Sequence, residues 1–393
     1  MKKILAMLLA LVMVMGLVAC GGNAPETTAP AETNAPAEST PAESTPAVSD
    51  VEYKIAMITD YGDITDQSFN QTTYEAVKAF AETNGVAYNY YKPSGDSTAE
   101  RIAMVDAAIV DGYNVIVMPG FAFGETLAEV ADLYPEVKFI ALDVAEGEGG
   151  FTATENVFSA VYQEELSGYM AGVAAVKLGY KHLGYLGGMA VPAVQRFGYG
   201  FLQGVDAAAK ELGIVGDIKV EYVYGNQFYG DADITAVMDT WYGEKGVEIV
   251  FACGGGIWSS AAEAAAKVGG KVIGVDVDQA AIIDGQYGEG MTVTSAMKGL
   301  APTVNTLLTA IILEDNWAAY AGKIETLGLV SADPEANYVQ IPMASTQFAE
   351  GFTAEDYSAL VAAMFEGTVV VSGDISAFPT TEVAVETYAD IKG

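Results

Sequence analysis

The sequence is poor in the residues that most often carry catalytic or metal chemistry. It has one histidine, His182, and two cysteines, Cys20 and Cys253, among 393 residues. Most protein metal sites combine several such ligands, so we expect no metal and no cofactor. His182 follows Lys181 at the start of a predicted strand, and no nucleophile–base pair is recognisable. We therefore predict a binding protein rather than an enzyme.

Positive charge is scarce as well. The chain has 18 Lys and Arg against 52 Asp and Glu, and its formal net charge at pH 7 is −34. Proteins bind nucleic acids chiefly through Lys and Arg contacts to phosphates, so this balance argues against a nucleic-acid partner. An acidic surface favours solubility but says little about the fold.

Long apolar runs are lacking except at the N-terminus. Residues 4–18 are apolar apart from Gly16, and they follow Lys2 and Lys3. The run is shorter than the roughly 20 residues that a membrane span needs. With its charged start it predicts a secretory signal peptide over residues 1–19. We expect the rest of the chain to be soluble apart from a lipid anchor.

The end of this signal resembles a bacterial lipobox. Residues 17–20 read Leu-Val-Ala-Cys and are followed by two glycines. In such signals the cysteine becomes the lipidated first residue of the mature chain. We therefore predict lipidation at Cys20 and a location on the extracytoplasmic face of the cell membrane, where the acyl chains form the anchor. Cys253 would then have no cysteine partner for an intramolecular disulfide.

Residues 20–50 contain this cysteine and a segment with recurring prolines among Ala, Glu, Ser and Thr. Such a composition offers few apolar side chains to bury. We predict a disordered, extended tether between the anchor and the folded part.

Strand and helix patterns alternate along the folded part. Apolar strand patterns fall at residues 51–59, 88–91, 115–118 and 138–143, and helical patterns at 67–85, 97–112 and 123–134. The alternation restarts with strands at 182–187, 218–224, 249–253 and 272–275, and helices at 162–178, 193–212, 231–245 and 258–268. This pattern is typical of parallel sheets covered by helices on both faces.

The two α/β units are too large to share a single core, so we predict two lobes. One lobe would comprise residues 51–157 with about 289–325, and the other residues 158–288 with about 326–393. Chain crossings near residues 157, 289 and 325 would then form the hinge between the lobes.

Acids, glycines, aromatics and amides gather at the ends of the predicted strands, where ligands of open α/β sheets bind. They are Asp60, residues 120–123, Asp143, residues 226–228, residues 254–256 and Asp276. Carboxylates accept hydrogen bonds from hydroxyls, glycines admit a ligand to the backbone, and aromatic faces stack on flat rings. This set predicts a neutral, hydroxyl-rich, partly aromatic ligand. The glycines at 254–256 do not form a phosphate loop, because no Lys-Ser or Lys-Thr pair follows them.

A series of short motifs runs in order through residues 52–300. It comprises Asp60, the segment Asp66-Gln67-Ser68-Phe69-Asn70-Gln71, and the segments at residues 119–121, 171–172, 187–189, 274–278 and 294–298. In these residues the chain resembles the basic membrane lipoprotein (PnrA-like) family of purine-nucleoside-binding lipoproteins that feed ABC importers. The resemblance implies a two-lobed periplasmic-binding-protein type I fold and a monomer that captures a nucleoside for an ABC permease by hinge closure.

The resemblance also implies how the base would be bound. Phe69 and Phe228 correspond to rings that stack on the two faces of the base. Asn70 and Asp143 would bind its polar edges. Around Phe228, however, the chain reads Gly-Asn-Gln-Phe-Tyr where the family usually has a Gly-Ser-Phe-like sequence.

For the ribose, the resemblance implies a set formed by Asp60, Asp276 and Lys298, with Gly254 contributing backbone. Burying two carboxylates together is costly without a cation. We therefore expect Lys298 to neutralise one carboxylate while the other accepts hydrogen bonds from hydroxyls.

Two further residues have alternative interpretations. Asp66 suits a helix cap, and we favour capping over ligand contact for this residue. Trp258 stands where the family has a glycine-rich continuation, and it could reach into the cleft or cap its mouth.

Other functions remain open. The same fold could bind a free sugar or another small solute, in which case a second stacking ring would be unnecessary and the substitution Phe228→Ala would be tolerated. A surface enzyme acting on nucleosides is disfavoured by the lack of a base pair or metal cluster. An adhesin or signalling lipoprotein would show no thermal shift with small molecules.

Overall fold

The computed structural model describes residues 51–393, and its strands form two separate sheets. The first sheet contains β1 (Lys54–Ile58), β2 (Ala87–Tyr91), β3 (Val115–Pro119), β4 (Lys138–Leu142), β5 (Val157–Tyr162) and β11 (Lys323–Leu327). The second contains β6 (His182–Gly187), β7 (Lys219–Tyr224), β8 (Ile249–Cys253), β9 (Lys271–Asp276), β10 (Thr292–Lys298), β12 (Val339–Gln340) and β13 (Ala384–Thr387). The predicted signal peptide, Cys20 and the tether lie outside the described residues.

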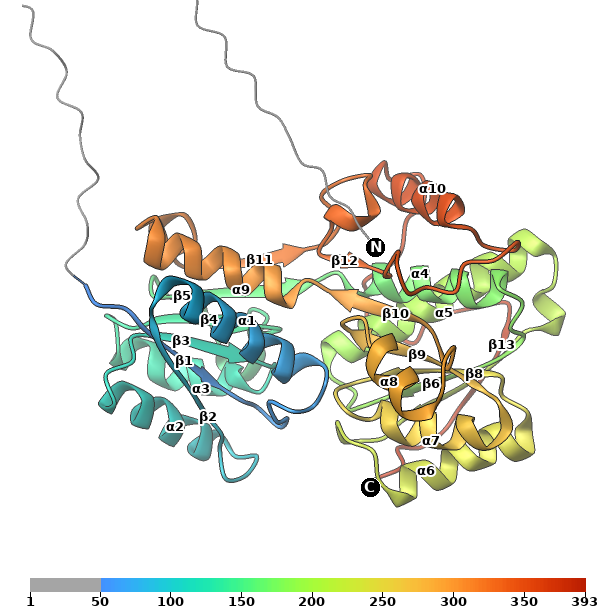
Figure 1. The fold of residues 1–393 in the computed structure, drawn as a ribbon, viewed down its shortest axis with the longest axis horizontal. Helices are drawn as coiled ribbons and strands as arrows, with labels where there is room; N and C mark the ends of the chain where they lie inside the picture. Colours follow the sequence, from blue (N-terminus) through green and yellow to red (C-terminus); the bar gives the residue numbers. More distant parts are fainter. Residues whose placement is uncertain (1–50) are drawn as a thin grey trace, which may run out of the picture. The chain divides into compact units, whose positions relative to one another are not determined.

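Both sheets are almost entirely parallel. The strand order is β11-β5-β4-β3-β1-β2 in the first sheet and β12-β10-β9-β8-β6-β7-β13 in the second. Only β12 is antiparallel to its neighbour, β10. We call the parts built on these sheets the first and second lobe (Figure 1). The predicted α/β architecture is therefore confirmed.

Helices cover both faces of the first sheet, so the side chains on both sides of its strands are buried. The side chains of Ile55 and Met57 in β1 pack in the core with α1 (Phe69–Asn84) and α9 (Leu300–Leu308). Those of Ala56 and Ile58 point to the other face, toward α2 (Thr98–Val110) and α3 (Phe123–Val130). Successive residues of a strand face opposite sides, so a run without polar residues is what a doubly covered parallel sheet requires.

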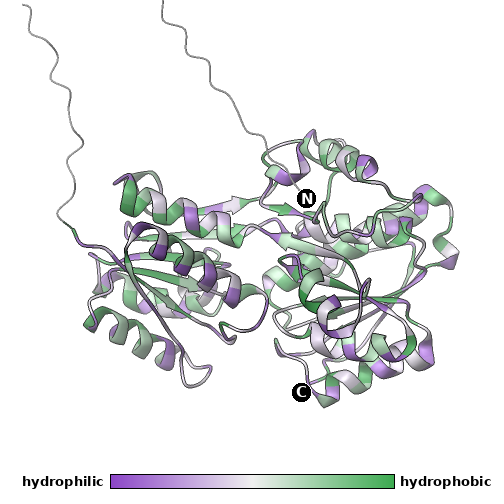
Figure 2. Cartoon of the chain, in the orientation of Figure 1, coloured by the Kyte–Doolittle hydropathy of each residue, from purple (hydrophilic) through white to green (hydrophobic). Residues whose placement is uncertain are grey.

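The second lobe repeats this construction. Leu183 and Tyr185 of β6 pack in one core with α4 (Glu164–Lys177), α5 (Pro192–Leu212) and α10 (Ala354–Phe365). Leu186 lies on the opposite face, with α6 (Ala232–Asp239), α7 (Trp258–Val268) and α8 (Ala280–Tyr287). Figure 2 shows hydrophobic strands inside both lobes and hydrophilic residues mainly on outer helix faces and loops.

Two of the predicted lobe boundaries need correction. Strand β5 pairs with β4 as far as Ala160 and with β11 as far as Tyr162, and both partners belong to the first sheet. The chain therefore crosses after Tyr162 rather than near residue 157. Strand β10 pairs with β9 and β12 of the second sheet, so the next crossing follows Lys298 rather than residue 289. The third crossing follows β11, which ends at Leu327.

Residues 49–393 form one compact unit. Within residues 51–393, side chains between Tyr53 and Ile391 form four hydrophobic cores, so we expect this segment to fold as a unit. Within residues 51–393, no helix combines the length and the apolar character needed to cross a membrane.

Candidate functional site

A cavity of about 560 Å³ lies where the carboxyl ends of the two sheets meet. Both lobes line it, and its size is in the range of small-molecule sites. Every residue predicted to bind the ligand lines this cavity: Asp60, Phe69, Asn70, Asp143, Phe228, Gly254, Asp276 and Lys298. The fold brings them together because each one follows or ends a strand, or lies in the first turn of α1.

Asp66 sets up the start of α1. Its carboxylate accepts hydrogen bonds from the backbone N–H groups of Ser68 (2.9 Å), Asn70 (2.9 Å) and Gln71 (3.0 Å). These are among the N–H groups that have no partner within a helix. The predicted capping role of Asp66 is therefore confirmed. Ser68 does not cap with its side chain; its hydroxyl donates to Asp276 Oδ2 in the other lobe at 2.6 Å.

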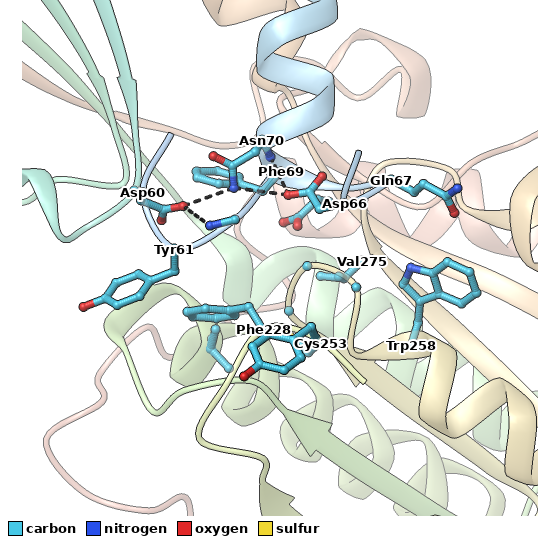
Figure 3. A pocket seen from close by; sticks show the side chains of 18 of the residues that line it. Asp60, Tyr61, Asp66, Gln67, Phe69, Asn70, Phe228, Cys253, Trp258 and Val275 are labelled. Atoms are coloured by element: carbon cyan, nitrogen blue, oxygen red, sulfur yellow. Dashed lines mark hydrogen bonds between the residues drawn. The ribbon is translucent and has the colours of Figure 1, made fainter. Parts of the chain in front are cut away.

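Asp60 and Asn70 form a hydrogen-bonded pair on the first-lobe side of the cavity. Asn70 Nδ2 donates to Asp60 Oδ1 and to Asp66 Oδ2, both at 3.1 Å (Figure 3). Burial raises the pKa of Asp60 to about 6, although hydrogen bonds from the Gly62 N–H and from Asn70 oppose the shift. Asn70 Oδ1 is buried and has no hydrogen-bond partner in the described part of the chain. The pair therefore offers a ligand one amide oxygen and one carboxylate.

Gly120 makes room for this pair. A Cβ atom at this position would lie 2.1 Å from Asp60 Oδ2, and the residue has a φ of +128°. Either feature alone disfavours any side chain here. Glycine is thus required at position 120, because the Asp60 carboxylate occupies the space that a side chain would need.

Aromatic rings face the cavity from both lobes. Figure 3 shows Phe69 on the first-lobe side and Phe228 on the second-lobe side. The Lys298 ammonium lies 4.7 Å from the centre of the Phe69 ring, so a ligand ring can stack only on the other face of Phe69. Gly188 and Gly254 leave room for Phe228, because Cβ atoms there would lie 2.5 Å and 3.0 Å from its ring.

Tyr61 is an aromatic residue of the cavity that the sequence analysis missed. Its ring stacks on Phe121 at 5.8 Å between centres, with an interplanar angle of 15°. It also contacts Phe228 of the other lobe at 6.2 Å and 48°. An aromatic residue directly after Asp60 at a strand end was the signal that could have identified it. This ring contact from the first lobe helps to fix the position of Phe228 in the second lobe.

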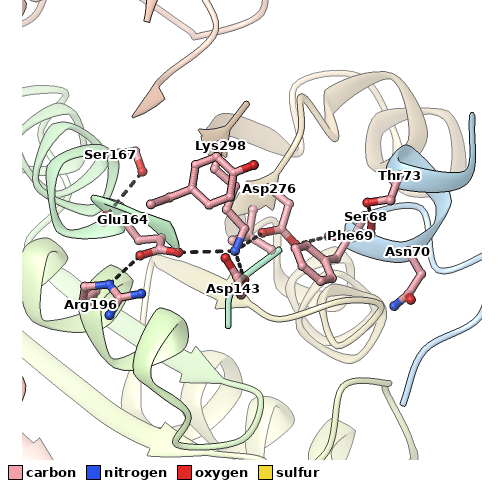
Figure 4. A network of polar contacts seen from close by, with 12 residues as sticks. Ser68, Phe69, Asn70, Thr73, Asp143, Glu164, Ser167, Arg196, Asp276 and Lys298 are labelled. Carbon is pink, nitrogen blue, oxygen red and sulfur yellow. Dashed lines mark hydrogen bonds and ion pairs between the residues drawn. The ribbon is translucent and has the colours of Figure 1, made fainter. Parts of the chain in front are cut away.

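The floor of the cavity is a buried charge cluster centred on Lys298 (Figure 4). Lys298 Nζ contacts the carboxylate of Asp143, and it lies 3.4 Å from Glu164 Oε1 and 3.9 Å from Asp276 Oδ1. Arg196 Nε donates to the other oxygen of Glu164 at 2.6 Å. The Lys298 side chain is 3% exposed, so water does not screen these contacts.

Acids outnumber cations in this cluster. Burial alone would lower the pKa of Lys298, but the charges of Asp143, Glu164 and Asp276 outweigh it and hold that pKa above its usual value. Burial raises the pKa of Asp143 to about 7 and also raises that of Asp276, against the influence of Lys298. Lys298 thus only partly offsets the effect of burial on Asp143 and Asp276. Asp143 Oδ1 is buried and makes no hydrogen bond to the described residues.

Direct contacts join the lobes around the cavity. Besides the bond from Ser68 to Asp276, Gln279 Nε2 donates to the backbone oxygen of Gln67 at 3.0 Å. The Lys298–Asp143 ion pair also crosses from one lobe to the other. The lobes are thus in a closed arrangement in which the cavity is bounded on both sides.

The sequence model of the Bmp family, described as "ABC transporter substrate-binding protein PnrA-like", matches residues 53–332. The chain belongs to this family. The predicted family resemblance is confirmed, and the match covers both lobes up to the segment after β11.

Individual relatives agree with this assignment. The ABC transporter nucleoside-binding protein BmpA of Lactococcus lactis is 29% identical over 241 residues, which cover 58% of this chain and 65% of that protein, just under two thirds. An uncharacterized lipoprotein of Pyrococcus abyssi is 29% identical over 185 residues, or 46% of this chain and 44% of that protein. A crystal structure of an ABC transporter solute-binding protein from Aeropyrum pernix has a TM-score of 0.63 at 24% identity, covering 81% of this chain and 87% of that one. This structure shares the predicted two-lobed fold.

Besides Tyr61, two members of the buried charge cluster were not predicted from the sequence. Glu164 and Arg196 complete the charge cluster. Glu164 is the first residue of α4, directly after β5, and Arg196 lies in the second turn of α5. Acidic residues opening a helix whose remaining residues are almost all buried were the available signal for Glu164. Such residues need a buried partner, but the sequence does not show which one.

Across residues 51–393, no group of three or more His, Cys, Asp or Glu side chains is arranged to hold a metal ion. Cys253 is a buried free cysteine that lines the cavity. His182 lies 2.9 Å from Glu221 Oε1, away from the cavity-lining residues, in a structural contact.

Proposed function

We propose that this protein captures a purine nucleoside between its lobes and delivers it to an ABC permease. The observation that carries the proposal is the pairing of Phe69 and Phe228 across one cavity, with unpartnered polar atoms of Asn70 and Asp143 beside them. The Lactococcus relative named as nucleoside-binding supports the choice of ligand class.

The base would lie between the two rings. Stacking of a base on an aromatic side chain contributes about 1–3 kcal/mol in nucleic-acid-binding proteins. Asn70 Oδ1 can accept a hydrogen bond from a ring or exocyclic N–H of the base. Asp143 Oδ1 can accept a hydrogen bond, or donate one when protonated, which its pKa of about 7 allows near neutral pH. A purine supplies both donors and acceptors along its edge.

The sugar would be bound by the carboxylate of Asp276. Asp276 Oδ2 is engaged by Ser68, and its Oδ1 is 3.9 Å from Lys298, so this oxygen can still accept from a hydroxyl. Asp60, which the family resemblance implies for the sugar, is hydrogen-bonded to Asn70, so we propose that its carboxylate binds the ligand at the base end; the Gly254 backbone is accessible because the residue has no side chain. Excess negative charge around the cavity favours a neutral ligand over a phosphorylated one.

The mechanism would be closure about the three chain crossings. A ligand that contacts both lobes shifts the population toward the closed form, because it binds that form more tightly. The contacts from Ser68 to Asp276 and from Gln279 to Gln67 would then add to the ligand in holding the lobes together. The permease would recognise the closed form. We further propose that the protein acts as a monomer without catalytic activity, held on the outer face of the cell membrane by acylated Cys20.

Calorimetric titration of residues 49–393 with inosine and adenosine tests the proposal. The variants Phe69→Ala and Phe228→Ala should each weaken binding by about 1–3 kcal/mol, which is about 5- to 150-fold in Kd. Phe365→Ala serves as the matched control, because Phe365 is 47% exposed and lies outside the cavity. Nucleoside binding that survives both cavity substitutions unchanged would refute the stacking clamp. Ribose binding that tolerates Phe228→Ala would instead support a sugar-binding protein.

A further inference from the structure

Trp258 brings an unsatisfied hydrogen-bond donor to the cavity. It is the first residue of α7, it lines the cavity, and it is only 4% exposed. Its Nε1 has no hydrogen-bond partner anywhere in residues 51–393. An indole N–H can only donate, and a buried donor without a partner costs free energy. An acceptor on the ligand would remove that cost.

Gln67 brings an unsatisfied acceptor to the same end of the cavity. Its side-chain Oε1 is buried and unpartnered in the described structure. Figure 3 shows Gln67 and Trp258 together at one end, opposite the end that holds Asp60 and Tyr61. Neither Trp258 Nε1 nor Gln67 Oε1 bonds another group within residues 51–393, so this donor and acceptor contribute no hydrogen bond to the described fold.

The backbone of Gln67 is held in an unusual conformation by contacts from both lobes. Its φ is +56°, a value that residues other than glycine seldom adopt. Its N–H donates to Gln71 Oε1 at 3.0 Å, and its carbonyl oxygen accepts from Gln279 Nε2 at 3.0 Å. Strained backbone of this kind persists where the surroundings fix it and is frequent at functional sites. The position of this side chain therefore depends on closure of the lobes.

The loop before Trp258 is tied to the aromatic clamp. The Gly256 N–H donates to the backbone oxygen of Phe228 at 2.8 Å. The Tyr287 ring meets the indole edge to face, with 6.5 Å between centres. Trp258 is thus held at a fixed place relative to the ring that would stack on the base.

The surrounding charges select a neutral ligand group. Ser68, next to Gln67, bonds Asp276, which we assign to the sugar. Of the two lysines that line the cavity, Lys92 pairs with Asp63 at 2.5 Å and Lys298 pairs with Asp143. Neither is left to neutralise an anionic group here. A hydroxyl can accept from the indole and donate to the amide oxygen at the same time.

We infer that Trp258 and Gln67 form a subsite that binds an uncharged hydroxyl group of the ligand's sugar, beside Asp276. The inference rests on the proposed capture of a hydroxyl-bearing ligand and adds the residues that select one end of it. It also gives Trp258, which replaces a glycine-rich stretch, a role in ligand discrimination.

The test compares Trp258→Phe with the unsubstituted protein, both as residues 49–393. This change keeps an aromatic ring and removes the N–H. Trp317→Phe is the control, because it removes an indole N–H that donates to the Glu155 carbonyl oxygen outside the cavity. Each protein is titrated calorimetrically with inosine and with its 2′-, 3′- and 5′-deoxy forms. We expect W258F to raise Kd for inosine by about 3- to 10-fold, the effect of one uncharged hydrogen bond.

The deoxy forms identify the bond itself. For the one that lacks the bound hydroxyl, W258F and the unsubstituted protein should have equal Kd, while W317F matches the unsubstituted protein throughout. Equal Kd values of W258F and the unsubstituted protein for inosine, or an equal penalty for all four ligands, would overturn the subsite while nucleoside capture stands.

If the protein binds ribose and no nucleoside, the subsite is tested by comparing W258F with the unsubstituted protein, with ribose and its deoxy forms as the ligands. A W258F penalty confined to one hydroxyl would support the subsite although the nucleoside proposal fails. A uniform penalty, or none, would overturn it, and binding of neither class would overturn both proposals.

Discussion

Replacing Lys298 by methionine would test the buried charge cluster. Methionine has a similar length but no charge, so the change removes the ammonium and fills much of its space. Lys298 contacts Asp143, Glu164 and Asp276, whose side chains are 9%, 0% and 7% exposed. These carboxylates would remain buried with Arg196 as their remaining cation in the cluster.

The expected cost is large. Removing one partner of a buried ion pair destabilises proteins by about 3–5 kcal/mol, because the other charge is left uncompensated. We expect K298M to lower the free energy of unfolding by about this amount at pH 8. Lys267→Met is the matched control. Lys267 pairs with Asp239 at 2.8 Å, but its side chain is 47% exposed, and exposed pairs contribute little.

The cost should depend on pH in a definite direction. Burial already raises the pKa of Asp143 to about 7, and loss of the ammonium should raise it further. A carboxyl group whose pKa is higher in the folded than in the unfolded protein favours folding at low pH, and that stability is lost as pH rises through the folded-state pKa. The difference between K298M and the unsubstituted protein should therefore be smaller at pH 5 than at pH 8.

Urea denaturation followed by circular dichroism, at pH 5 and pH 8, measures both quantities. A loss below about 1 kcal/mol at pH 8, or a larger loss at pH 5 than at pH 8, would refute the interpretation that Lys298 neutralises buried acids. A K267M loss as large as that of K298M would also refute it.

Two further changes probe the first-lobe side of the cavity. The pKa of Asp60 is about 6, above its ordinary value of 3.8, so its contribution to stability is complete below about pH 4 and is lost as pH rises through 6. Asp60→Asn removes this titration and should reduce the fall in Tm between pH 4.5 and pH 7.5; an unchanged fall would contradict the assignment. Gly120→Ala should lower Tm more than Gly179→Ala: both glycines have φ above +100°, but only at Gly120 does a Cβ meet another atom closely, 2.1 Å from Asp60 Oδ2. Equal losses of Tm would mean that backbone strain alone explains the need for glycine.

Local patterns were sufficient to predict the architecture. Strands such as β3 and β8 are apolar on both faces, and regular helices separate them, so a doubly covered parallel sheet followed from their periodicity. The positions of Asp143 and Asp276 at the cavity followed in turn, since parallel strands bring their carboxyl ends to one edge.

The lobe crossing after β10 was misplaced for a physical reason. Gly288 and Gly290 mark the turn before β10, whereas the change of lobe comes at Gly299, between the end of β10 at Lys298 and the start of α9 at Leu300. Which sheet a strand joins depends on long-range pairing, here with β9 and β12. The edge strand β13, which alternates little and is mostly exposed, gave no sequence signal at all.

The partners within the site were the least predictable part. A counter-ion role was expected for Lys298, but its contact with Glu164 arises only because α4 begins beside the end of β10. The free donor of Trp258 likewise becomes evident only when the surrounding side chains are placed. Pairings between segments more than a hundred residues apart are set by packing, which single-sequence patterns do not encode.

The central claim, nucleoside capture, is tested most directly by calorimetric titration of residues 49–393 with guanosine, adenosine, inosine, uridine, cytidine and ribose. The account predicts tight binding of purine nucleosides and no comparable binding of ribose, because the base would stack on Phe69 and Phe228. Binding of ribose alone, or of no compound in the panel, would contradict it and leave only the two-lobed solute-binding fold.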